Sequence, residues 1–224
     1  MRTFLRDNGL SIAFGLLLLG SLVGQALSGH AMIVNQLVAR GVEGISMGQY
    51  LTSADFAVDV AENWQSEYLQ FFLYIMATVW LIQRGSPESK PDERIGTETD
   101  EEQKVGAYAT ERSPAWARAG GWRTALFSRS LGLVMLGLFL LSWLAQSVAG
   151  VASYNSEQIM DFEEPLTWAR YLGAADFWNR TMQNWQSEFL AIGSMVILSV
   201  YLRQRGSPES KPVGAAHATT DENG

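Results

Sequence analysis

The apolar residues of this chain are gathered into long blocks separated by very polar segments. No Asp, Glu, Lys or Arg occurs from Asn8 to Ala39 or from Ser130 to Ser156. Each block is longer than the roughly 20 residues that a helix needs to cross a hydrocarbon core about 30 Å thick. The pattern therefore predicts transmembrane helices near residues 10–31 and 131–152.

Two shorter apolar stretches, residues 68–83 and 189–202, are too short to cross the core alone. We expect the polar residues before each stretch to extend it, which gives transmembrane helices near 59–82 and 180–203. At 1.5 Å per residue, Glu67 would then lie roughly 22 Å from the inner end of its helix, inside the core. A carboxylate at that depth is costly and needs a partner or a wet cavity.

The sequence matches itself without a gap when it is shifted by 121 residues. Nineteen of the 37 paired positions from 55 to 91 are identical. Each copy contains two apolar segments, so both copies must enter the membrane with the same orientation, as a parallel repeat. The matching positions include N-W-Q-S-E at 63–67 and 184–188, Q-R-G-S-P-E-S-K-P at 83–91 and 204–212, and the pairs Gln25 with Gln146, Gly29 with Gly150, and Tyr50 with Tyr171.

Together these patterns predict an all-α integral membrane protein with four transmembrane helices, built from two parallel tandem helical hairpins. The hairpins comprise residues 1–91 and 122–212. Residues 92–121 are polar and lack an apolar period, so we expect a flexible cytoplasmic linker there, and a disordered tail over 213–224. The N-terminus resembles a signal peptide, but the same segment recurs in mid-chain, which favours a retained helix.

The distribution of basic residues predicts the orientation. With both termini in the cytoplasm, 13 of the 16 Lys and Arg residues fall on the inner side. Only Arg40, Arg170 and Arg180 remain outside. We therefore expect a multi-pass protein of the plasma membrane with cytoplasmic N- and C-termini and an acidic outer face.

Composition disfavours several classes of function. The chain has no cysteine and only two histidines, which leaves little material for thiolate or histidine-rich metal sites. It contains no Gly-rich phosphate loop or H-E-x-x-H motif. Its net charge of −7 disfavours nucleic-acid binding. We expect no enzyme activity, no metal, no cofactor and no nucleic-acid partner.

The repeated N-W-Q-S-E runs contain the strongest candidate site. Asn63 and Glu67 are four residues apart and therefore share one helical face, as do Asn184 and Glu188. In one interpretation the two carboxylates meet, and shared protons or bound cations balance their charge. In the other, these side chains stabilise the bundle by hydrogen bonds between helices, or reach the outer interface.

Two further pairs belong to this site. Gln25 and Gln146 are the expected partners of the carboxylates in the structural interpretation. Trp64 and Trp185 are expected to anchor their helices at the membrane interface, where tryptophan is enriched.

The repeated Q-R-G-S-P-E-S-K-P segment is a strong helix-stop signal. Arg complements the C-terminal end of the helix dipole, Gly permits a left-handed cap and Pro prevents continuation. These roles do not explain the identity through the final Lys and Pro, which indicates either a recent duplication or a docking motif for a cytoplasmic protein. The candidate docking residues are Gly85, Ser86, Pro87, Gly206, Ser207 and Pro208.

The two hairpins, each with N-W-Q-S-E followed by a G-S-P-E-S-K-P exit, resemble a small family of bacterial membrane proteins described only as a domain of unknown function. The resemblance implies a location in the bacterial inner membrane and supplies no catalytic residue. We expect a non-enzymatic envelope scaffold or interaction protein in contact with the lipid bilayer. The alternative is a small channel or a proton- or cation-coupled transporter that uses Glu67 and Glu188. A homodimer is compatible with so narrow a bundle.

Overall fold

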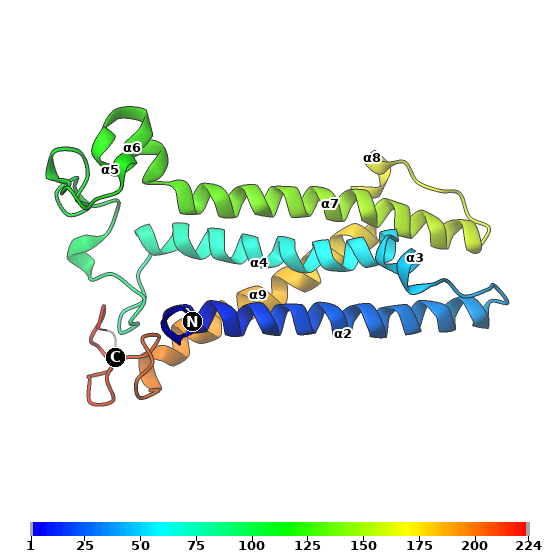
Figure 1. The fold of residues 1–224 in the computed structure, drawn as a ribbon, viewed down its shortest axis with the longest axis horizontal. Coiled ribbons are helices and arrows are strands. Elements are labelled where there is room, and N and C mark those ends of the chain that lie inside the picture. Colours follow the sequence, from blue (N-terminus) through cyan, green and yellow to red (C-terminus); the bar gives the residue numbers. More distant parts are fainter. Residues whose placement is uncertain (1, 223–224) are drawn as a thin grey trace. The chain divides into compact units, whose positions relative to one another are not determined.

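The computed structural model describes residues 2–222. All regular elements among these residues are helical, in agreement with the predicted all-α class. Figure 1 shows four long helices, α2 (Gly9–Ala39), α4 (Ala54–Trp80), α7 (Ser130–Met160) and α9 (Ala175–Tyr201). The shorter elements are α1 (Arg2–Asp7), α3 (Met47–Leu51), η1 (Asp92–Arg94), η2 (Gly106–Tyr108), α5 (Ala115–Ala119), α6 (Gly121–Phe127) and α8 (Trp168–Tyr171).

Helices α2 and α7 are both long and apolar enough to cross a membrane. Each has 31 residues, which corresponds to a length of about 46 Å. Each continues eight residues beyond the predicted span, to Ala39 and Met160. The additional turns are mostly apolar in α2, with Asn35 and Gln36 as the polar residues, and mostly polar in α7.

Helices α4 and α9 have 27 residues each. Both begin five residues before the predicted bounds of 59 and 180 and end two residues before 82 and 203. Their length is sufficient for a span of about 40 Å, but their first halves carry charged residues. By length and composition, therefore, only α2 and α7 qualify as spans among the described residues.

The chain divides into two compact units, each made of two segments. The first unit contains Met1–Ala61 and Ala145–Leu172, and the second contains Glu62–Leu144 and Gly173–Gly224. Helices α4 and α7 contribute residues to both units.

In the first unit, the short helices α3 and α8 begin in the same way. Ser46 caps α3 by accepting a hydrogen bond from the backbone N–H of Gln49. Thr167, which matches Ser46 at the 121-residue offset, caps α8 by accepting from the N–H of Arg170. Each cap satisfies an N–H group that the first helical turn leaves without a partner. At the start of α4, Ser53 Oγ likewise accepts a hydrogen bond from the backbone N–H of Phe56, at 3.3 Å.

The last residue of α8 and a matching residue of α3 are tyrosines that pack on glycines of the long helices. Tyr50 and Tyr171 are 2% and 0% exposed. A Cβ atom added to Gly29 would lie 2.0 Å from the Tyr50 hydroxyl oxygen, and one added to Gly150 would lie 2.6 Å from that of Tyr171. These approaches require glycine, because no side chain fits between the helix backbone and the phenol.

The second unit is filled by an aromatic cluster between the first half of α7 and α9. The Trp143 ring lies at its centre and stacks on Phe139 and Phe177, with centroid separations of 5.4 and 6.1 Å. Trp178 and Trp185 complete the cluster at 6.2 and 6.0 Å from Trp143. Large aromatic surfaces of this kind supply much of the packing energy of a helical interface.

Candidate functional site

Glu67 on α4 and Glu188 on α9 share one side-chain donor in the second unit. When the Gln70 amide is oriented with its nitrogen toward the two carboxylates, which satisfies both of its polar atoms, that nitrogen donates to Glu188 Oε2 at 2.8 Å and to Glu67 Oε2 at 3.2 Å. Gln70 lies one turn after Glu67, so both side chains project from the same face of α4. The two carboxylates that match at the 121-residue offset are thus bridged by a single neutral amide.

Ser66 gives Glu188 a second contact with α4. Its hydroxyl oxygen lies 3.3 Å from Glu188 Oε1 and 2.9 Å from the backbone oxygen of Asn63. Ser66 is buried, at 1% exposed. Two side chains of the facing helix α4, Ser66 and Gln70, therefore bind Glu188.

The two asparagines of the N-W-Q-S-E runs are arranged differently from the carboxylates. The Asn184 side chain donates to the backbone oxygen of Arg180 at 2.9 Å, within its own helix. Asn63 is exposed. It stays a prediction that each asparagine forms one polar site with the glutamate four residues later.

The two candidate anchors also differ. Trp64 is 44% exposed. Trp185 belongs to the aromatic cluster, and its indole N–H donates to Gln65 Oε1 at 2.9 Å. Gln65 is fully buried, at 0% exposed. A role of Trp185 in joining α9 to α4 was not predicted from the sequence.

Gln25 and Gln146 belong to the first unit, whereas Glu67 and Glu188 belong to the second. Gln25 is half-buried on α2, and Gln146 on α7 is 1% exposed. The predicted contacts between these glutamines and the carboxylates therefore stay a prediction. The glutamine that does reach both carboxylates is Gln70, which sequence comparison of the copies overlooked because Ala191 occupies the matching position.

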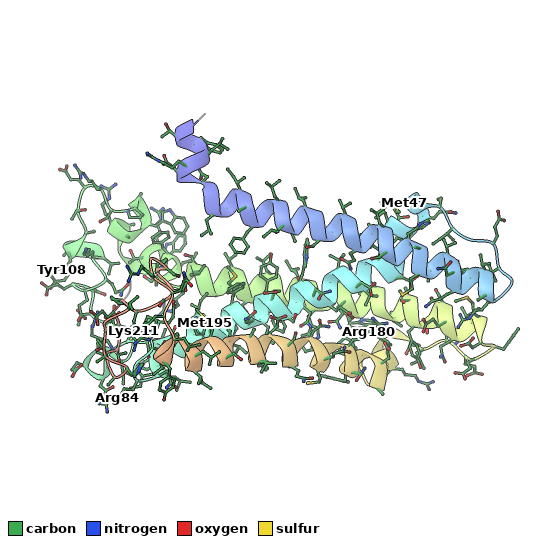
Figure 2. All side chains as sticks on the ribbon, turned by 90° about the horizontal axis from the view of Figure 1, so that it is seen from below. Met47, Arg84, Tyr108, Arg180, Met195 and Lys211 are labelled. Carbon is green, nitrogen blue, oxygen red and sulfur yellow. The ribbon has the colours of Figure 1, made fainter. Side chains whose placement is uncertain are left out.

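The repeated nine-residue segments, here named the first exit turn (83–91) and the second exit turn (204–212), fold alike. The backbone N–H of Gln83 donates to Ser89 Oγ at 2.8 Å, and that of Gln204 donates to Ser210 Oγ at 2.9 Å. In both turns the glycine has a left-handed backbone, with φ of 87° at Gly85 and 83° at Gly206. The predicted left-handed cap is therefore present in each copy. Figure 2 shows Arg84 and Lys211, one from each turn, at one end of the second unit, and Arg180 toward the other end.

The exit turns bring together a second pair of matching carboxyl groups. Partial burial, followed by a side-chain hydrogen bond with Glu209 and by the charge of Glu209, raises the pKa of Glu88 to about 7. In each turn a serine hydroxyl fixes the glutamate backbone, since Ser86 Oγ accepts from Glu88 N–H at 3.2 Å and Ser207 Oγ accepts from Glu209 N–H at 3.2 Å. A hydrogen bond between two carboxyl groups requires a proton on one of them, and the raised pKa of Glu88 lets it take up and release that proton near neutral pH.

The sequence contained a signal for this pair that motif analysis did not use. Glu88 and Glu209 are separated by the same 121 residues as Glu67 and Glu188. Matching residues near an axis that relates two copies contact each other, so a repeated ionisable residue predicts a pair of like charges. Among the described residues, no group of three or more His, Cys, Asp or Glu side chains could hold a metal ion.

The comparisons with known proteins address the family alone. No curated protein and no solved structure matches the chain. One family model matches residues 1–222. Because this match covers nearly the whole chain, it confirms the expected membership in a family described only as a domain of unknown function. The protein belongs to the family described as Domain of unknown function (DUF6766).

Proposed function

We propose that this chain is an integral protein of the bacterial inner membrane with four transmembrane helices, α2, α4, α7 and α9, and with both termini in the cytoplasm. Two tandem hairpins in parallel orientation would then form the bundle. The apolar character of α2 and α7 supports two of the spans. The length of α4 and α9, and the basic residues that flank their C-terminal ends, support the other two.

The role we propose is that of a non-enzymatic scaffold or interaction protein whose polar helix faces organise the bundle. The observation that supports this role is the set of hydrogen bonds between α4 and α9. Glu188 is bound by Ser66 and Gln70, and Trp185 is bound by Gln65. In lipid, polar side chains satisfied by a facing helix hold helices together, because no water competes for their hydrogen bonds.

A second candidate function is proton- or cation-coupled transport through Glu67 and Glu188. The observation in its favour is that one neutral amide serves both carboxylates. Two negative charges in a membrane interior need a proton or a cation in addition to such a donor.

One experiment on the double variant Glu67→Gln, Glu188→Gln distinguishes the scaffold role from transport. The native protein and the variant are reconstituted in liposomes, and proton and sodium flux are measured beside thermal stability in detergent. The matched control is Glu43→Gln, Glu164→Gln, which removes two carboxylates at the same 121-residue offset from the connections outside the long helices.

For a scaffold we expect no flux from the native protein and a lower melting temperature for the variant, with the control unchanged. Native flux that disappears in a variant of unaltered stability would replace the scaffold role with transport. Unaltered stability in the absence of any native flux would contradict both candidates.

A further inference from the structure

The two exit turns have the same nine residues and the same local fold, but they differ in exposure. Ser86 is 1% exposed and Pro87 is buried. In the second turn, Ser207 is half-buried and Pro208 is exposed. A Cβ atom added to Gly206 would meet nothing within 4 Å. Sequence therefore does not cause the difference, and something outside the first turn covers it.

The cover is the C-terminal segment, residues 215–221. Thr220 Oγ1 accepts a hydrogen bond from the backbone N–H of Gly85 at 3.0 Å. The backbone N–H of Asp221 donates to the carbonyl oxygen of Ser86 at 3.3 Å. The carbonyl oxygen of His217 lies so close that a Cβ atom on Gly85 would be 2.2 Å from it. The segment thus binds the turn through its backbone and one hydroxyl group.

Three basic side chains, Lys211, Arg94 and Arg203, hold this segment in place, and Arg203 does so by donating to the carbonyl oxygen of Ala215 at 3.1 Å. The ammonium of Lys211, which is 1% exposed, donates to the carbonyl oxygens of Ala216, His217 and Thr219 at 3.2, 2.8 and 3.2 Å. These three bonds use all the donors of an ammonium group. Arg94 forms an ion pair with Asp221.

The matching lysine of the first turn holds a different segment. Lys90 donates to the carbonyl oxygen of Gly96 at 2.9 Å and pairs with Glu98 at 3.0 Å. Gly96 matches His217 at the 121-residue offset, so both lysines bind the carbonyl six residues later in the chain. The segment bound by Lys90 leaves the second exit turn uncovered, whereas the segment bound by Lys211 covers the first.

We propose that residues 215–221 form an intramolecular strap that closes the first exit turn, so that only the second turn is accessible to a cytoplasmic protein that recognises this motif. Release of the strap would double the number of accessible copies. The strap is a device beyond the scaffold role; it rests on the proposed topology, in which both exit turns are cytoplasmic, and is independent of transport.

The test uses the natural absence of cysteine. Ser86→Cys and Ser207→Cys are made singly in the full-length protein, purified in detergent and reacted with a water-soluble maleimide. Each rate is divided by the rate of the same variant in denaturing detergent, which removes differences in intrinsic thiol reactivity. We expect the Ser86→Cys variant to react on the order of tenfold more slowly, because labelling must await local opening.

Two changes then act on the strap. Deletion of residues 214–224 removes it, and Thr220→Ala removes the hydroxyl group that binds the backbone N–H of Gly85. Both changes should raise the rate of the Ser86→Cys variant and leave that of the Ser207→Cys variant unchanged. Thr219→Ala is the matched control, because the backbone carbonyl that Lys211 binds is retained. Equal rates in the full-length chain, or a Ser86→Cys rate that neither change raises, would overturn the proposal. An unchanged Ser207→Cys rate also verifies that each altered protein is folded.

Discussion

The two units use matching positions of the sequence in opposite ways. In the first unit, the same contact is made twice, by Tyr50 on Gly29 and by Tyr171 on Gly150. In the second unit, matching residues interact with each other, through the Gln70 amide for Glu67 and Glu188, and directly for Glu88 and Glu209.

This difference changes what a substitution should do. A contact that occurs twice within separate elements can be lost in one copy without affecting the other. A contact between copies is lost when either partner changes, and the second change then costs little. Additivity of free energies in double mutants is therefore the quantity that separates the two units.

The largest effects are expected from the glycines of the first unit. Gly29→Ala and Gly150→Ala place a methyl group against a buried tyrosine, and each should lower the free energy of unfolding by about 2–3 kcal/mol. Gly29→Ala should cost more, because its Cβ would lie 2.0 Å from the phenol oxygen rather than 2.6 Å. The double variant should show the sum within about 0.5 kcal/mol. Chemical denaturation in detergent measures all three.

Gly15→Ala on α2 is the control for this series, because a Cβ atom there meets nothing within 4 Å. It should leave stability unchanged or slightly raised, since alanine is the better helix former. A double variant much more stable than the sum predicts would show that the two tyrosine contacts are coupled.

An intermediate effect is expected at the amide bridge of the second unit. Gln70→Leu removes the donor that Glu67 and Glu188 share, and should cost about 1–3 kcal/mol. Glu188→Gln on that background should recover part of the loss, because one carboxylate without a donor is eliminated. The coupling energy from the double-mutant cycle should exceed about 0.5 kcal/mol.

Gln186→Leu serves as the control, since Gln186 is an exposed glutamine of α9. It should leave the stability within about 0.5 kcal/mol of that of the native protein. Additive free energies for Gln70→Leu and Glu188→Gln would mean that the carboxylate does not depend on the bridge.

The all-α class and the approximate positions of the four long helices were predictable, because they follow from apolar blocks and stop signals that the sequence shows directly. The amide bridge was not. Ala191 occupies the position of the second copy that matches Gln70. Comparison of the two copies therefore gives no indication of the residue that joins Glu67 to Glu188. Which helices face each other depends on packing, and packing is absent from any one-dimensional pattern.

The contacts of residues 215–221, which belong to the tail for which we expect disorder, were not predictable either. The polar composition of the tail predicts a chain that cannot bury a core. In the structure it is bound through backbone carbonyl groups, which Lys211 and Arg203 contact. Every residue has such a carbonyl, so composition carries no signal for this interaction. Composition likewise carries no signal for the short elements η1, η2 and α5, which lie within residues 92–121.

The smallest effect concerns the dependence of stability on pH at the exit turns. The pKa of Glu88 is raised from its ordinary value of 4.5 to about 7 in the folded protein. Between these values the folded state holds a proton that the unfolded state has released, so the free energy of unfolding should fall as pH rises through this window. We expect a loss of about 1 kcal/mol, well below the value for a fully buried group, because the Glu88 side chain is exposed to solvent.

Unfolding of the full-length protein in detergent between pH 5 and pH 8 measures this loss, and two substitutions assign it. Glu88→Gln and Glu209→Gln should each abolish it, since a glutamine amide donates to the remaining carboxylate and replaces the shared proton. Combining them should change the pH dependence no further, which is the coupled behaviour expected of the second unit. Glu101→Gln, at an exposed carboxylate of the linker, should retain the full loss. A pH dependence that survives either exit-turn substitution would place the titrating group elsewhere, and the two turns would then fold alike without sharing a proton.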